Sequence, residues 1–397
     1  MNTYALTNPF LKADEKLPFG SDKSAVNEKT LLDWKLTVNQ LLMDCLNRRA
    51  SDMHLAVGLP PACRIDGVLT ELSLPPLLPE DTQAIVQALL TRDQLEHLQE
   101  NGDVDISLAF GDSFRCRLNA FTEKEQFGLA IRIFNPIIPD FKVLGLPDVL
   151  TNLSRLRKGL VLVTGPAGSG KTTTLASMVD WINTNRNCHI ITLEDPIEYF
   201  HFHKSSIIHQ RQIGRDAKSY ASAIKAALRQ DPDVILIGEM RDAESISAAL
   251  TAAETGHLVL STLHTLGAAK TMDRIIDIYP SSGQNQIRSQ LAAVLQGIVS
   301  QQLIPKANEN GRVAAVEVMI PNFAIRNLIR ENKIHQIENV LQTGGKHSMR
   351  LMDISLSELV KQGIIKKEEA CSRASDPESL MRMLALEDSY HKAKAKA

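Results

Sequence analysis

Long apolar runs are missing from this sequence of 397 residues. A membrane-spanning helix needs roughly 18 consecutive apolar residues, and the longest runs found, at 160–163 and 234–237, are far shorter. A secretory signal is missing as well, because Lys12, Asp14 and Glu15 stand where its apolar core would lie. We therefore expect no membrane span and a cytoplasmic location.

Cysteine is scarce, and no two cysteines have the two-residue spacing of a zinc or redox pair. An odd number of widely separated cysteines favours reduced thiols that act mainly as packing groups. The five are Cys45, Cys63, Cys116, Cys188 and Cys371.

An excess of charge of either sign is also missing. The chain has 44 Lys and Arg against 46 Asp and Glu, a formal net charge of −2. Such a chain offers no overall positive field to phosphate backbones, so we expect no direct binding of nucleic acid. The length exceeds the roughly 250–300 residues at which a single core stops growing, which predicts two domains.

Composition and periodicity divide the chain into five parts. The polar residues 1–29 lack periodicity and predict a flexible extension. A first domain follows over 30–134, and the proline-containing segment 135–147 predicts a linker. A second domain covers 148–384, and the Lys/Ala-rich residues 385–397 predict a frayed tail.

The first domain shows helical spacing at 31–46 and over a predicted helix at 80–98. Apolar and polar residues alternate over 103–134, which predicts antiparallel strands with a turn at Gly111-Asp112. Alternation places arginines on one polar face of that sheet. These are Arg115, Arg117 and Arg132.

The second domain alternates short, continuously apolar runs with helical segments, the pattern of a parallel sheet covered on both faces. The runs occupy 160–164, 189–193, 234–238 and 258–263, with a further strand at 312–320 and a helical tail to residue 384.

A complete phosphate-binding loop follows the first of these strands and precedes a helix. Glycine allows backbone N–H groups to surround phosphates, Lys171 reaches the β and γ oxygens, and the Thr172 hydroxyl can hold Mg²⁺. A glycine-rich turn without a ligand is the alternative, but the full pattern and both flanking elements disfavour it. The predicted nucleotide contacts are Gly165, Ala167, Gly168, Ser169, Gly170, Lys171, Thr172 and Thr173.

Other candidate residues follow strands whose carboxyl ends should share one sheet edge. Glu239 directly follows the run 234–238 and is expected to orient water, bind the metal, or do both. Asp195 and Glu198 stand in an acidic segment that could support Mg²⁺ through waters, although such segments are more often solvated turns. His264 is placed to contact a γ-phosphate, although a lone histidine is more often structural. For His201, His203 and His209 a surface or interface role is favoured over metal binding.

Taken together, these motifs resemble the secretion and pilus ring ATPases, and within them the type IV pilus retraction ATPases. The resemblance covers roughly residues 30–384, and its most discriminating part is the C-terminal pair of motifs. The matching segments are the phosphate loop, 192–199, 231–242, 256–265, the N-terminal 50–55 and 64–67, and the C-terminal 324–331 and 342–345.

The resemblance implies a PAS-like α+β N-terminal domain followed by a RecA-like ATPase domain with C-terminal helices. It further implies ATP and Mg²⁺ as ligands, a homohexamer, and a role for Arg115, Arg117 and Arg132 in reaching the nucleotide. The expected function is an ATP-hydrolysing motor for pilus retraction and twitching motility. It would bind a platform protein at the cytoplasmic face of the inner membrane, with membrane association through partners only.

Three alternatives remain open from the sequence. The first is a motor of a related secretion or DNA-transfer system, which the balanced charge disfavours. The second is a nucleotide-dependent switch that does not hydrolyse, and the third is an accessory paralogue of a retraction motor. The complete loop with Glu239 disfavours the second, and the motif 324–331 disfavours the third.

Overall fold

The computed structural model describes residues 28–48, 50–65, 67–110, 114–134, 137–308, 311–344 and 348–394. The chain divides into two compact units, Met1–Pro136 and Ile137–Ala397. Almost all of the predicted extension 1–29, the predicted turn at Gly111-Asp112 and residues 395–397 lie outside the described residues. Within the described part, no helix is long and apolar enough to cross a bilayer.

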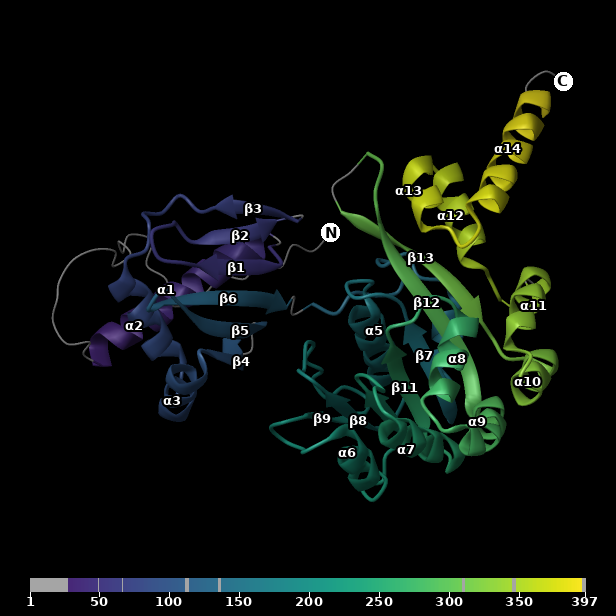
Figure 1. Cartoon of the computed structure of the whole chain (residues 1–397), viewed down its shortest axis with the longest axis horizontal. Coiled ribbons are helices and arrows are strands. Elements are labelled where there is room, and N and C mark those ends of the chain that lie inside the picture. The colour runs from purple at the N-terminus through teal and green to yellow at the C-terminus, as the bar shows by residue number, and fades with distance from the viewer. Residues whose placement is uncertain are drawn as a thin grey trace. The chain divides into compact units, whose positions relative to one another are not determined.

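The first unit combines one antiparallel sheet, in the order β3-β2-β1-β6-β5-β4, with helices α1 to α3 (Figure 1). Alternate strand residues such as Cys116, Leu118 and Ile131 are buried in one core with residues of α1 and α2, as period-two strands require. The elements are α1 (Glu28–Asn47), β1 (Asp52–Leu55), β2 (Ala62–Ile65), β3 (Val68–Glu71), α2 (Pro79–Leu89), α3 (Arg92–Asn101), β4 (Asp103–Phe110), β5 (Phe114–Glu123) and β6 (Gln126–Phe134).

The single helix predicted over 80–98 is wrong, because the chain forms two helices there. Leu90 is extended and Thr91 caps α3. The Thr91 hydroxyl accepts from Gln94 N at 3.4 Å, and Thr91 N donates to the Gln94 side chain at 2.9 Å. This reciprocal capping box starts a new helix at a point where the apolar periodicity shows no break.

The prediction of five reduced thiols is wrong for Cys45 and Cys63, which form a disulfide. The packing of α1 on β2 brings their Cα atoms to 6.4 Å, within the range that a disulfide can join. Cys116, Cys188 and Cys371 are free. Burial raises the pKa of the Cys116 thiol to about 12, which suits a packing group.

The second unit is built on a seven-stranded sheet in the order β13-β12-β7-β11-β10-β8-β9 (Figure 1). All neighbours are parallel except β12 and β13, which form a long antiparallel pair. The strands are β7 (Gly159–Thr164), β8 (His189–Glu194), β9 (Ile207–Gln212), β10 (Val234–Ile237), β11 (Leu258–Leu263), β12 (Leu295–Pro305) and β13 (Arg312–Met319).

Alternate residues of the central strands enter two separate cores. On β7, Leu160 and Leu162 pack with α6, α7, α8 and α9, whereas Val161 and Val163 pack with α4 and α5. The sheet is thus covered on both faces, which is why its strands are continuously apolar. The helices are α4 (Val149–Ser154), α5 (Lys171–Asn185), α6 (Tyr220–Ala227), α7 (Ala243–Glu254), α8 (Ala268–Asp277) and α9 (Ser281–Val294).

A series of helices follows β13. One group, α12 to α14, forms a smaller core with Ile304 of β12 and Ala315 of β13. At the start of the unit, Phe141 and Leu146 of the predicted linker 135–147 are buried in the core beneath α5. The C-terminal elements are α10 (Phe323–Arg330), the 3-10 helix η1 (Ile334–Gln336), α11 (Ile337–Thr343), α12 (Met352–Lys361), α13 (Lys367–Arg373) and α14 (Pro377–Lys394), which extends into the segment predicted to be frayed.

Candidate nucleotide-binding site

The predicted phosphate loop connects the buried strand β7 to helix α5. Gly165 has φ 143°, and a Cβ there would lie 2.2 Å from the backbone oxygen of Gln301. Gly170 has φ 87° and caps α5. Because both positions combine positive φ with close neighbours, only glycine fits them without strain. The loop therefore places its backbone close to β12 and opens at the N-terminus of α5, where partial positive charge favours phosphate.

Lys171 turns its ammonium group back over this loop. Its Nζ donates to the backbone oxygens of Gly165 and Pro166, each at 2.9 Å. The residue is 7% exposed, and burial lowers its pKa, while the charges of Glu239 and Glu198 act in the opposite direction. The ammonium group is therefore held in place by carbonyl oxygens that a phosphate can replace.

His264 connects Lys171 with Glu239. Its Nδ1 lies 3.4 Å from Lys171 Nζ, and its Nε2 lies 3.5 Å from Glu239 Oε1. An ammonium group only donates, so Nδ1 must accept and the proton of the neutral ring must be on Nε2. The ring thus presents an N–H to the carboxylate at the mouth of the loop.

Glu239 follows β10 at the edge where β7, β8 and β11 also end. Its second oxygen, Oε2, accepts from Arg241 Nε at 2.8 Å, and the carboxylate raises the pKa of Arg241. The Glu239 side chain is 20% exposed, so it is oriented by two neighbours and still reaches solvent. Arg241 was not predicted from the sequence, and its position two residues after the carboxylate was the available signal.

The acidic segment at the end of β8 contains a buried carboxylate that sequence reasoning did not separate from its neighbours. Glu194 accepts from Thr192 Oγ1 at 2.6 Å and from Gln210 Nε2 at 3.3 Å. Burial raises its pKa to about 7. Glu198 is near enough for its charge to act on Lys171, and the Asp195 charge acts on Arg241.

Two threonines tie the start of α5 to its surroundings. The Thr173 hydroxyl lies 2.9 Å from the hydroxyl of Tyr199 in the acidic segment. Thr174 donates to the Gln301 side chain at 2.9 Å. Thr172, between them and Lys171, is partly exposed at the helix N-terminus, where a hydroxyl oxygen is available to a cation.

The three predicted arginines belong to the first unit. Arg117 on β5 is directly opposite Arg132 on β6, and Arg115 pairs with Phe134 in the same ladder. Arg117 contacts Asp105 at 3.1 Å, and Arg132 contacts Asp52 at 3.1 Å. These pairs are exposed, so they contribute little to stability and can exchange partners.

The histidines of the β8–β9 region differ in their surroundings. Within the described ranges, no group of three or more His, Cys, Asp or Glu side chains could hold a metal ion. His189 Nε2 and His209 Nδ1 are 2.8 Å apart. The predicted surface or interface role is wrong for His201, whose side chain is 2% exposed. Burial lowers the pKa of His201 to about 4.

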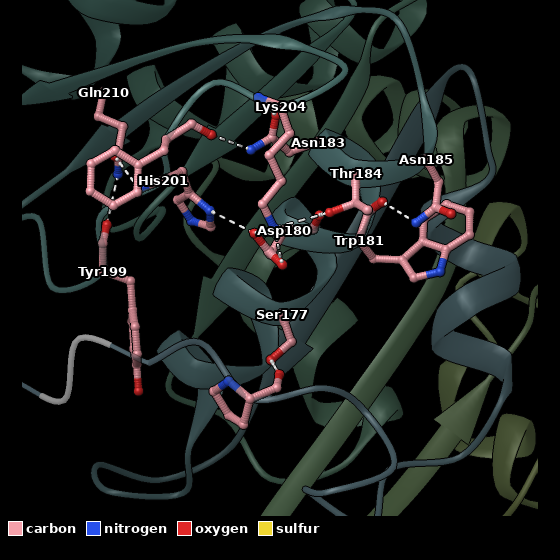
Figure 2. A network of polar contacts seen from close by, with 12 residues as sticks. Ser177, Asp180, Trp181, Asn183, Thr184, Asn185, Tyr199, His201, Lys204 and Gln210 are labelled. Carbon is pink, nitrogen blue, oxygen red and sulfur yellow. Dashed lines mark hydrogen bonds and ion pairs between the residues drawn. The ribbon is translucent and has the colours of Figure 1, made fainter. Parts of the chain in front are cut away.

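His201 instead belongs to a polar network on the outer face of α5. In Figure 2 the His201 ring and the Lys204 side chain both point at Asp180, at 4.0 Å and 2.7 Å. One turn earlier, the Ser177 hydroxyl donates to the backbone oxygen of Pro139 at 2.8 Å. The helix that begins at the phosphate loop is therefore attached to the first residues of the second unit.

The chain is similar to a protein family and to known proteins over most of its length. Residues 31–384 match the family model described as type II/IV secretion system protein. The chain is 44% identical over 344 residues to the type IV pilus retraction ATPase PilT of Pseudomonas aeruginosa, covering 87% of this chain and 100% of that protein. It is 45% identical over 320 residues to a twitching motility protein of Neisseria gonorrhoeae, covering 81% and 86%.

A solved structure is similar over nearly the same range. The crystal structure of the pilus retraction motor PilT with bound ADP superposes with a TM-score of 0.80 at 48% identity, covering 86% of this chain and 98% of that one. The predicted fold class, an α+β N-terminal domain followed by a P-loop ATPase domain with C-terminal helices, is confirmed.

Proposed function

Since the chain belongs to the type II/IV secretion system protein family, we propose that it is an ATP-hydrolysing motor that powers retraction of type IV pili. The observation that carries the proposal is the series of contacts from Lys171 through His264 to Glu239 at the mouth of the phosphate loop. It combines a phosphate-binding cation with a carboxylate that reaches solvent. Similarity to PilT over most of both chains assigns this ATPase to pilus retraction.

In this proposal each group acts on a different part of the reaction. Lys171 and the loop N–H groups bind the β and γ oxygens and stabilise charge that develops there. Glu239 accepts a hydrogen bond from the attacking water and orients it for in-line attack. His264, whose Nε2–H faces Glu239, contacts the γ-phosphate and so detects whether it is present.

The oxygen groups at the site suit Mg²⁺, which prefers hydroxyl, carboxylate and phosphate oxygens. Thr172 and Glu239 are the residues that would hold it, with Asp195 and Glu198 supporting the site through waters. When bound, the ion neutralises charge on the phosphate oxygens.

The motor is proposed to be a homohexamer, as the family resemblance implies, in which Arg115, Arg117 and Arg132 of the first unit reach a nucleotide. The segment 135–147 would act as the hinge between a domain at 30–134 and a domain at 148–384, which close on ATP and open on release of products. The motor would act at the cytoplasmic face of the inner membrane by binding a platform protein, with no direct contact to nucleic acid.

The proposal is tested by measuring twitching motility in cells from which the gene for this protein has been deleted. Complementation with the wild-type chain should restore twitching motility, and Lys171→Ala should not, because the loop then lacks its cation. Lys225→Ala is the matched control, because this exposed lysine of α6 forms a surface ion pair with Glu244 of α7 at 2.9 Å. Motility should stay at the wild-type level. Normal twitching in the strain without the gene would overturn the proposal.

A second assay separates the alternative motor classes. A DNA-transfer motor would show ATPase activity that rises strongly with DNA and an affinity for DNA that falls with salt. A retraction motor should show neither property.

A further inference from the structure

We propose that Gln301 is a positioning residue for nucleotide binding, which holds the Ser169–Gly170 peptide so that its N–H faces a bound phosphate. This inference rests on the proposed function, because it concerns the same phosphate loop. Gln301 lies on β12, on the side of β7 opposite to Glu239 and His264, and no motif of the sequence includes it.

The side chain of Gln301 bridges the loop and the helix that follows it. Its Nε2 donates to the backbone oxygen of Ser169 at 2.5 Å, and its Oε1 accepts from Thr174 Oγ1 at 2.9 Å. The orientation of the amide follows from its partners, because a backbone carbonyl only accepts and must face the NH₂ group. Gln301 is 2% exposed, so water does not compete for these bonds.

The bond to Ser169 has a consequence for Gly170. In a trans peptide the C=O and the following N–H point in opposite directions. Since the Ser169 oxygen points at β12, the Gly170 N–H points away from that strand. The described residues supply no acceptor for this N–H, as is usual for the first N–H groups of a helix, so it is available to a bound phosphate.

Glycine at two loop positions keeps this bridge possible. A Cβ on Gly165 would lie 2.2 Å from the main-chain oxygen of Gln301, and a Cβ on Gly170 would lie 3.0 Å from its Nε2. The same residue of β12 thus contacts both ends of the loop. A rotated Ser169–Gly170 peptide would leave the amide of Gln301 buried without an acceptor, which is unfavourable.

The two residues beside Gln301 on β12 have partners outside the phosphate loop. The Ser300 hydroxyl accepts at 2.9 Å from the backbone N–H of Gly267, which lies three residues after His264. Gln302 points to the other side and donates to the backbone oxygen of Arg373 at 3.3 Å, in the C-terminal helices. Gln302 is also buried, at 8% exposure, and therefore provides a control of the same residue type on the same strand.

The experiment compares Gln301→Met with Gln302→Met in the full-length protein. Methionine has a similar length and no amide. Gln301→Met should weaken MgADP binding by about tenfold and raise the KM for ATP similarly, because phosphate loses a charge-assisted hydrogen bond. Gln302→Met should bind MgADP like the wild type. Wild-type binding by Gln301→Met, or an equal loss in both variants, would overturn the inference.

A second pair of variants decides the matter if Gln301→Met does not fold. Thr174→Val removes only the hydroxyl that fixes the amide, and should weaken MgADP binding by about threefold. Thr174→Ser keeps the hydroxyl and should restore wild-type binding. Equal binding by these two variants would contradict the inference. Failure of the wild-type protein itself to bind MgADP would instead contradict the proposed function.

Discussion

The pKa values of two side chains of the site, Lys171 and Glu194, are shifted in opposite directions by the same cause. Burial disfavours the charged form of each, so it lowers the pKa of Lys171 and raises that of Glu194. The Glu239 and Glu198 carboxylates oppose the shift of Lys171 and so favour its charged form. Glu194 is held by neutral donors, Thr192 and Gln210.

Glu194 therefore predicts a pH dependence of stability. Its folded pKa is about 7 and its ordinary value is 4.5, so between these values the folded state binds a proton that the unfolded state has lost. Its contribution to stability is complete below pH 4.5, falls as pH rises, and levels off above about 7. Glu194→Gln should remove this decrease in the free energy of unfolding, which amounts to roughly 3 kcal/mol.

The measurement is the free energy of unfolding in urea at several pH values from 5 to 8. Glu244→Gln, on the exposed end of α7, is the control and should keep the wild-type slope. Parallel pH curves for the wild type and Glu194→Gln would show that Glu194 does not carry this effect.

At the scale of elements, a carboxylate of α12 adds polar contacts to the apolar core that α12, α13 and α14 share. Asp353, in the first turn of α12, accepts from Ser375 N at 2.8 Å and from Asp376 N at 2.9 Å, just before α14. Asp353 is 7% exposed. It therefore satisfies two backbone donors that have no helical acceptor of their own.

Asp353→Ala should lower the free energy of unfolding by about 2–3 kcal/mol, because two partly buried N–H groups lose their carboxylate acceptor. Asp376→Ala is the matched control. It removes one exposed bond, to Ser379 N at 3.0 Å, and should lower stability by only about 1 kcal/mol. Equal urea midpoints for Asp353→Ala and the wild type would contradict this account of the helix contacts.

Which elements the sequence could predict depends on how local their signals are. Strands β7, β10 and β11 are continuously apolar because both of their faces are covered, so they were found directly. Strand β12 was missed, because it follows α9 without a turn and contains the polar run Ser300-Gln301-Gln302. Strand β9, at the sheet edge, was missed because its pattern is mostly polar.

The candidate site divides in the same way. The phosphate loop, Glu239 and His264 each follow a strand and could be predicted from motif and position. The contacts of Gln301 with Ser169 and of Glu194 with Gln210 depend on which strands are neighbours in the sheet, and no single segment of the sequence shows the strand order. The Cys45–Cys63 disulfide was missed for the same reason, since it joins a helix to a strand.

At the scale of the whole molecule, the chain consists of two units with separate cores, and the nucleotide site described here lies in the second. Two of the predicted arginines of the first unit, Arg117 and Arg132, form exposed ion pairs with Asp105 and Asp52. Their proposed contact with nucleotide requires these exposed ion pairs to open, at small energetic expense.

Steady-state phosphate release by the purified protein with Mg²⁺ and ATP tests the central claim most directly. The wild-type chain should turn over continuously. Glu239→Gln should lower the rate by about a hundredfold or more, because a neutral amide cannot take up the proton of the attacking water as a carboxylate does. ADP binding, which depends on the phosphate loop, should stay within about twofold of wild type. Glu254→Gln, at the far end of α7, should match the wild-type rate. Wild-type turnover by Glu239→Gln, or no turnover by the wild-type chain, would contradict the account.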